Sequence, residues 1–236
     1  MSSSNGKLTF LFIRHGETQD NIDRKLQGWR DTSLTDKGHR EAGVLASKLA
    51  STPIDVVYHS PLLRMQQTIA PILKDRKDVE VISDADLRGQ GLGVLEGGSY
   101  DDIDMSNPRS SDGTEGGELF DQFVQRIVKC FGRSLAKEAP KTSERGRTVA
   151  IAAHGVVITS IFKALEGSEK GWDNGGVAKR GPDAYEVRWT DSDDVARMVV
   201  GAEDVKTKEG GKEVDWNAMD KGAMLIEQWG KKEKAL

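Results

Sequence analysis

The chain has 236 residues, of which 36% are hydrophobic and 31% charged, a composition typical of a globular protein with a substantial apolar core. Its formal net charge of −4 argues against nucleic acid as a main partner, because binding to phosphate backbones needs a basic surface. Cys130 is the single cysteine, which excludes an intramolecular disulfide and a CxxC metal or redox site.

Membrane insertion and secretion are not expected either. No stretch approaches the roughly 20 consecutive apolar residues of a membrane span. The N-terminal letters MSSSNGK contain no apolar signal core. We therefore expect a cytoplasmic protein with no membrane partner.

Four short apolar runs predict strands of a parallel sheet that is covered on both faces. They are 8–13 (LTFLFI), 55–58 (DVVY), 79–82 (VEVI) and 148–153 (TVAIAA). Two later runs, 184–189 and 195–200, are separated by TDSDD and predict a hairpin.

Helical patterns lie between these runs. Thr35 is a candidate N-cap for a helix with apolar residues at i, i+3, i+4 and i+7, and Ser60-Pro61 predicts a second helix start, with proline in the first helical position. Two further amphipathic helices are predicted at 118–138 and 157–165. Alternating strands and helices indicate a three-layer α/β/α sandwich with a mostly parallel central sheet.

We divide the chain into a domain at 1–203 and a charged extension at 204–236. Within the domain, 86–117 is rich in glycine, aspartate and serine and predicts a long loop over the site. The extension is rich in lysine and glutamate. The helical spacing of its apolar residues predicts an amphipathic helix that packs on the same domain or, alternatively, forms a lid or a homodimer contact. These apolar residues are Trp216, Met219, Ala223 and Ile226.

Cationic and titratable side chains follow the predicted strands at their carboxyl ends, where open α/β sheets bind ligands. Arg14 and His15 follow the first strand, and His154 follows the fourth. Each histidine precedes a glycine, Gly16 or Gly155, which permits close backbone approach to a ligand. Arg64 lies in the first turn of the helix after the second strand. Two guanidiniums and two imidazoles at one sheet edge predict a phosphate pocket, because the arginine fork matches phosphate oxygens and a neutral imidazole can be phosphorylated.

Several segments resemble the histidine phosphatase superfamily, the phosphoglycerate-mutase-like proteins. FIRHGETQDNIDRKLQGWRDTSLTDKGHREA resembles the opening of that family, YHSPLLRMQQTIAPI its second arginine motif, and AIAAHGVVI its second histidine motif. LGVLEGGSYDDI and GTEGGELFDQFVQRI are similar to its middle segments. The similarity runs from about residue 8 to about residue 200, and the joint occurrence of these motifs in order is specific.

The resemblance implies a phosphoglycerate-mutase-like fold and hydrolysis of a small phosphorylated substrate, without a metal or organic cofactor. His15 would take the phosphoryl group, while Arg14, Arg64 and His154 would hold its oxygens. Asn21 and Gln27 match positions that bind phosphate or substrate. LQGW leans toward the phosphatases of the family, and the chain lacks the arginine-rich insertion of the mutases.

One position departs from the family pattern. Gly89 in LRGQGLGVLEG stands where the family has a glutamate that protonates the leaving oxygen, whereas Glu96 matches a separate glutamate. General acid catalysis typically contributes about 100- to 10,000-fold. A nearby carboxylate, such as Asp84, Asp86 or Glu115, could replace the acid. Alternatively, the substrate has a good leaving group, or the protein is a weak enzyme that mainly binds phospho-ligands or acts as a scaffold. A phosphoglycerate mutase is the other enzymatic alternative.

We expect the other two histidines and the cysteine to have structural or solvent-exposed roles. His39 lies on the polar side of a predicted helix, and His59 lies beside a strand end. Cys130 falls on an apolar helix face, which is typical of a small core residue.

Overall fold

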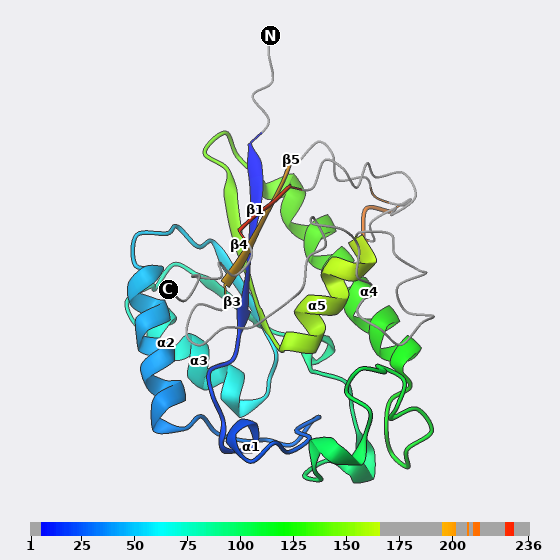
Figure 1. Ribbon diagram of the computed structural model, residues 1–236. Helices are drawn as coiled ribbons and strands as arrows, with labels where there is room; N and C mark the ends of the chain where they lie inside the picture. The colour runs from blue at the N-terminus through cyan, green and yellow to red at the C-terminus, as the bar shows by residue number, and fades with distance from the viewer. Residues whose placement is uncertain (1–5, 166–194, 202–206, 208–209, 213–224, 229–236) are drawn as a thin grey trace, which may run out of the picture.

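The computed structural model describes residues 6–165, 195–201, 207, 210–212 and 225–228, and every structural statement below concerns these residues. They form a single sheet with helices on both faces (Figure 1). The strands are arranged in the order β3-β2-β4-β1-β5-β6. Their bounds are β1 (Lys7–Arg14), β2 (Val56–His59), β3 (Glu80–Ser83), β4 (Arg147–Ala153), β5 (Val195–Gly201) and β6 (Leu225–Gln228).

The four strands predicted from apolar runs are all present as β1, β2, β3 and β4, each shifted by at most one residue at either end. β3, β2, β4 and β1 are mutually parallel, while β5 is antiparallel to β1 and β6 is antiparallel to β5. The sheet is therefore mostly parallel, as predicted.

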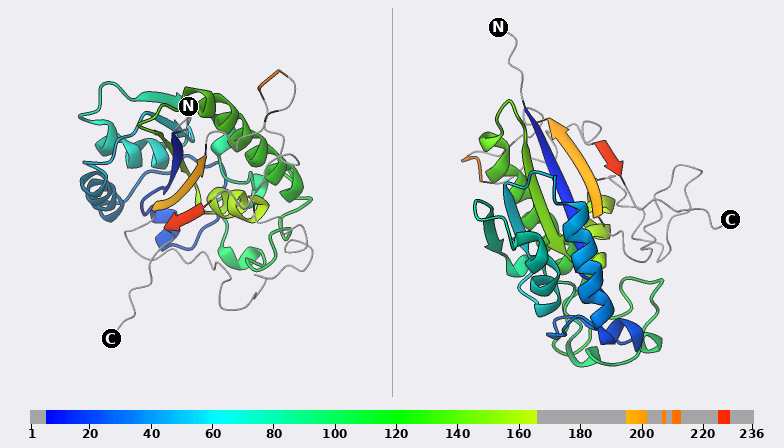
Figure 2. Two further views of the ribbon diagram at one scale, coloured as in Figure 1. Left: turned by 90° about the horizontal axis from the view of Figure 1, so that it is seen from above. Right: turned by 90° about the vertical axis from the view of Figure 1, so that its left-hand side faces the viewer.

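The helices form two outer layers. Their bounds are α1 (Gln19–Ile22), α2 (Asp36–Lys48), α3 (Leu63–Leu73), α4 (Phe120–Glu138) and α5 (Gly155–Leu165). α2 and α3 cover one face of the sheet, and α4 and α5 cover the other (Figures 1 and 2). The predicted α/β/α sandwich is thus confirmed.

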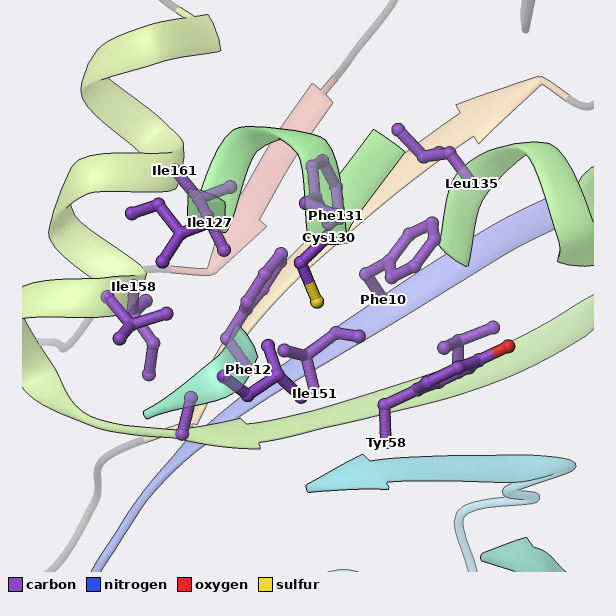
Figure 3. Close-up of a cluster of buried hydrophobic side chains, with 14 of the residues drawn as sticks. Phe10, Phe12, Tyr58, Ile127, Cys130, Phe131, Leu135, Ile151, Ile158 and Ile161 are labelled. Carbon is purple, nitrogen blue, oxygen red and sulfur yellow. The ribbon is translucent and has the colours of Figure 1, made fainter. Parts of the chain in front are cut away.

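Strand alternation divides the core into two parts. In β1, Phe10 and Phe12 point toward α4 and α5, whereas Leu11 and Ile13 point toward α2 and α3. The ring of Phe131 on α4 packs against both phenylalanines of β1, with ring centroids 5.2 and 5.7 Å apart (Figure 3). Burial on both faces explains why β1 is continuously apolar in the sequence.

Of the two helix starts predicted from the sequence, one is confirmed and the other is wrong. Thr35 caps α2 as predicted, since its hydroxyl accepts the N–H of Gly38. The predicted start at Ser60-Pro61 is wrong: α3 begins at Leu63, after an N-cap, Leu62, that has no side-chain hydrogen bond. The hydroxyl of Ser60 is instead engaged with a histidine from β4, which is described below.

The sheet continues past residue 203. β6 pairs with the outer edge of β5, so the predicted helix is wrong at Ile226, where backbone pairing with an open strand edge forms a strand instead. The other apolar residues of that predicted helix lie outside the described residues, as does the predicted strand 184–189. The domain boundary at 203 stays a prediction.

The segment 86–117 passes beside the carboxyl ends of the inner strands and contains short 3₁₀ turns at Gly93–Leu95 and Tyr100–Asp102. It lies beyond the end of the sheet together with α1 (Figure 1). In the described part of the chain, no helix is long and apolar enough to cross a membrane.

Candidate active site

Strand register brings the two histidines together. β1 and β4 pair in parallel with Arg14 opposite Ala153, so the next residue of each strand, His15 and His154, emerges at the same sheet edge. Their ring centroids are 5.3 Å apart. β2 pairs with the other side of β4, with His59 opposite Ala152, and this places Ser60 beside the same edge.

His15 is held in one tautomer by its own neighbour. Its Nδ1 lies 2.8 Å from the carbonyl oxygen of Gly16. A carbonyl can only accept, so Nδ1 carries the proton and Nε2 carries a lone pair. The backbone N–H of Gly16 donates to the hydroxyl of Thr68, 3.0 Å away, and a Cβ at position 16 would lie 2.7 Å from the carbonyl oxygen of Gly38. Glycine is therefore required here by close packing.

Both imidazoles are neutral at physiological pH. Burial, followed by the positive charges of Arg64 and Arg14, lowers the pKa of His15 to about 3. Burial, followed by the positive charge of Arg64, holds the pKa of His154 well below its usual range. A neutral ring with a free lone pair is the form that can attack an electrophile.

Arg64 supplies a buried positive charge. It is 2% exposed, and its guanidinium donates to the carbonyl oxygens of Arg30 (2.7 Å) and Gly28 (3.0 Å). Burial lowers its pKa to about 10, so it remains charged at neutral pH. Its Nε is buried without a hydrogen-bond partner in the described residues. Because the bonded partners are neutral oxygens, the charge is not cancelled by a contacting carboxylate.

His154 is oriented by a hydroxyl from the neighbouring strand end. Its Nε2 lies 2.9 Å from Oγ of Ser60, which is fully buried, and Oγ also accepts the N–H of Leu62 at 3.4 Å. Nδ1 of His154 is buried and has no partner among the described residues. The Ser60 hydroxyl is thus the one polar contact that fixes this ring within the described structure.

These side chains share one cavity of about 550 Å³. All seven predicted site residues line it: Arg14, His15, Asn21, Gln27, Arg64, His154 and Gly155. The side-chain oxygen of Asn21 accepts from the hydroxyl of Thr18, and that of Gln27 accepts from Thr32, so each amide is oriented through its oxygen. Gly155 begins α5, whose first N–H groups are suited to an anion.

Gly89 lies directly beside His154. A Cβ at position 89 would lie 3.9 Å from Cγ of His154 and 3.8 Å from Val156, which is ordinary van der Waals contact. The backbone at position 89 is held in a way that does not depend on which residue stands there. Its carbonyl oxygen accepts hydrogen bonds from Trp29 Nε1 (2.8 Å) and from Arg126 (3.0 Å). The position could therefore hold a larger side chain that reaches the cavity.

None of the three carboxylates considered as substitutes for the missing acid lines this cavity in the described residues. Asp84 and Asp86 contact Arg133 on α4 at 3.4 and 2.7 Å. Glu115 is absent from the lining, and Glu96 accepts the backbone N–H groups of Trp29 and Leu92. Among the described lining residues, the single carboxylate is that of Asp104.

The other histidines and the cysteine do not line the cavity. His39 is exposed on α2, and His59 donates from Nδ1 to the carbonyl of Ser60. Cys130 is a buried core residue, and burial raises its pKa. Sequence reasoning missed the roles of Ser60 and Thr68. The position of Ser60 directly after a strand, at the same edge as both site histidines, was the available signal.

A mostly parallel α/β sandwich with paired histidines and arginines at its carboxyl edge defines a class of phosphoryl-binding protein. The sequence model of the histidine phosphatase superfamily (branch 1) matches residues 10–179. The chain belongs to this superfamily.

Its relatives include phosphatases and mutases. A broad-specificity phosphatase of Saccharomyces cerevisiae is 31% identical over 70% of this chain and 73% of its own length. A 2,3-bisphosphoglycerate-dependent phosphoglycerate mutase of Bartonella tribocorum is 32% identical over 67% of this chain and 82% of its own length. A mycobacterial glucosyl-3-phosphoglycerate phosphatase has a similar fold, with a TM-score of 0.68 and 20% identity over 95% of this chain and 98% of that one.

Ser60→Ala tests the orientation of His154. Loss of the hydroxyl leaves a buried imidazole without its hydrogen bond, so we expect the free energy of unfolding to fall by about 1–3 kcal/mol. We also expect affinity for inorganic phosphate to fall by roughly fivefold to thirtyfold. Urea unfolding and calorimetric titration measure the two effects. Ser47→Ala on the exposed side of α2 is the control, and unchanged phosphate affinity in Ser60→Ala would contradict the assignment.

The lowered pKa of His15 predicts an acid-sensitive fold. Between pH 6.5 and about 3, His15 is protonated in the unfolded chain but neutral in the folded one, so stability falls as pH falls. We expect His15→Gln to flatten the dependence of unfolding free energy on pH over this window, by up to about 1.4 kcal/mol per pH unit. His39→Gln removes an exposed histidine and should keep the wild-type slope. Parallel curves for wild type and His15→Gln, measured by urea unfolding without phosphate, would refute the prediction.

Proposed function

We propose that the protein is a phosphatase that hydrolyses a phosphomonoester, or another phosphoryl compound with a good leaving group, through a phosphohistidine on His15. The observation that carries the proposal is the bond from Nδ1 of His15 to the carbonyl of Gly16, which leaves Nε2 with a lone pair in a cavity also lined by two arginines. Superfamily membership and the phosphatases among its relatives support a phosphatase-type enzyme.

In the first step, Nε2 of His15 attacks phosphorus, the P–N bond forms, and the P–O bond to the leaving group breaks. The leaving group departs with the electron pair. The ring becomes positive, and its Nδ1–H bond to the carbonyl of Gly16 stabilises that charge. Arg14 and Arg64 neutralise the phosphoryl oxygens, the electrostatic role that dominates phosphoryl transfer.

In the second step, water adds to phosphorus and the P–N bond breaks. His15 recovers its lone pair, and phosphate leaves with both protons of the water. His154, Asn21 and Gln27 position the phosphoryl group during both steps, and the N–H of Gly155 donates to it at the N-terminus of α5.

The identity of the leaving group follows from position 89. Gly89 offers no proton, and none of the carboxylates considered as substitutes lines the described cavity. Asp104, the single carboxylate on the described lining, has a lowered pKa and is therefore ionised at neutral pH, so it has no proton to donate either. The leaving oxygen then departs as an anion, which favours phenols, acyl phosphates and anhydrides over simple alcohols. For this reason we favour a substrate with a good leaving group over a carboxylate that replaces the missing acid.

Two other functions retain specific support. The similarity to phosphoglycerate mutases favours a mutase, for which the missing acid is a greater obstacle because an alcohol oxygen must leave. Gly89 also favours a catalytically weak protein that binds phospho-ligands or acts as a scaffold. Strong stimulation by 2,3-bisphosphoglycerate would identify the first, and ester binding without a trapped phosphohistidine would identify the second.

His15→Ala tests the nucleophile. We expect wild type to hydrolyse p-nitrophenyl phosphate, whose leaving group needs little protonation, and the variant to lose this activity to background. Acid quenching of wild type during turnover should trap an acid-labile phosphoenzyme that His15→Ala lacks. His59→Ala, which removes a histidine outside the cavity, is the control. Undiminished turnover in His15→Ala would end the mechanistic proposal.

Gly89→Glu tests the missing acid. The site accommodates a Cβ, so the carboxyl should reach the leaving oxygen and raise kcat/KM for alkyl phosphates by roughly 10- to 100-fold, within the usual range for general acids. The gain on aryl phosphates should be much smaller. Gly89→Gln has the same shape without the proton and should give no gain. An equal gain on both ester classes, or no gain on either, would show that another acid already serves.

A further inference from the structure

We propose that Asp104 makes the cavity select against a second anionic group, so that the substrate is a phosphomonoester with an uncharged, partly apolar leaving group. This inference rests on the proposed phosphatase function and specifies its substrate class. It concerns a residue that the sequence motifs do not single out.

The charges that line the cavity are unevenly distributed. Among the described lining residues, the permanent cations are Arg14 and Arg64, and the single carboxylate is Asp104. Arg14 ends β1 beside His15 and Arg64 lies in the first turn of α3, whereas Asp104 belongs to the 86–117 loop beyond the end of the sheet. The phosphoryl group therefore meets the positive part of the cavity, and the remainder of the substrate meets the part that holds a negative charge.

Asp104 is held as an anion by its own turn. Its carboxylate accepts the backbone N–H of Ser106 at 2.9 Å and the hydroxyl of Ser106 at 2.6 Å. These hydrogen bonds lower the pKa of Asp104. Its carbonyl oxygen accepts from Ser110 Oγ at 3.0 Å and from the N–H of Asn107 at 2.9 Å, so the backbone is fixed as well.

Three arginines in this loop and on α4 interact with other groups. Arg109 donates to Asp121 at 2.6 and 2.9 Å, and Arg126 pairs with Glu118 at 2.7 Å. Arg88 stacks over the ring of Trp29, 3.9 Å from its centroid. None of the three lines the cavity, so within the described residues Asp104 is not neutralised by a cavity cation.

The rest of the outer lining is neutral. Apolar side chains contribute a large share of it: Leu26, Leu92, Ile103, Met105, Pro108 and Phe120. Tyr100, Asn107 and Ser111 add uncharged hydrogen-bonding groups. Such a surface suits an aromatic leaving group with a few hydroxyls. A carboxylate or a second phosphate there would be repelled by the exposed carboxylate of Asp104, an effect that solvent and salt weaken.

The test compares two esters with leaving phenols of similar acidity: phenyl phosphate and its 3-carboxylate analogue. We expect wild type to prefer phenyl phosphate in kcat/KM by roughly threefold to tenfold at low salt, with the preference shrinking as salt screens the exposed carboxylate. Asp104→Asn keeps the turn, because its amide oxygen can still accept from Ser106, and should bring the ratio close to one. Asp104→Lys should reverse it.

Asp101→Asn is the matched control. Asp101 is exposed in the same segment and does not line the cavity, so this variant changes net charge equally and should keep the wild-type ratio. Equal use of both esters by wild type, or equal ratios in Asp104→Asn and Asp101→Asn, would overturn the inference while leaving the phosphatase proposal intact. Absence of turnover for both esters would refute the phosphatase proposal. In that case the ratio of the binding affinities of the two esters, measured by calorimetry, would test the role of Asp104 instead of the ratio of kcat/KM values.

Discussion

The parallel register of β1 against β4 is the constraint on which the site depends. Arg14 pairs with Ala153, and the chain then turns away from both strands at once, so the imidazoles of His15 and His154 face each other. A slip of one residue would send one ring to the opposite face of the sheet. The two-sided packing of Phe10 and Phe12 against α4, and of Leu11 and Ile13 against α2 and α3, prevents that slip. Core packing thus sets the geometry of the candidate active site.

The electrostatics of the site follow from what each charge contacts. Arg64 is held by carbonyl oxygens, which orient the guanidinium without neutralising it. Its field and the burial of both rings keep the imidazoles neutral, and a neutral imidazole does not compete with the arginines for the anion. The result on an acidic protein is a cavity whose inner part carries two positive charges. Anion binding here depends on two guanidiniums and on oriented N–H groups more than on net charge.

Much of this arrangement could be predicted from sequence. Apolar runs identified the four parallel strands. Residues at the strand ends and in the helix that follows the second strand identified Arg14, His15, Arg64, His154 and Gly155. The family resemblance identified Asn21 and Gln27. The failures have physical causes. Ser60 has the sequence signature of a helix cap, but its hydroxyl forms a hydrogen bond with His154, which is distant in the chain. Ile226 fits a helical spacing, but the open edge of β5 offers backbone partners that no local pattern reveals. Asp104 lies in a loop whose path depends on tertiary contacts.

The loop anchor at position 89 has a consequence for how this enzyme could change over evolutionary time. Trp29 and Arg126 bind the main-chain oxygen there, so the peptide stays in place whatever residue is encoded. A single codon change could then install or remove a proton donor while the surrounding scaffold stays intact. A substitution at position 89 would then change which leaving groups the protein can release without changing its fold. Descendants of one protein could differ in whether they release alcohols or phenols while remaining equally stable.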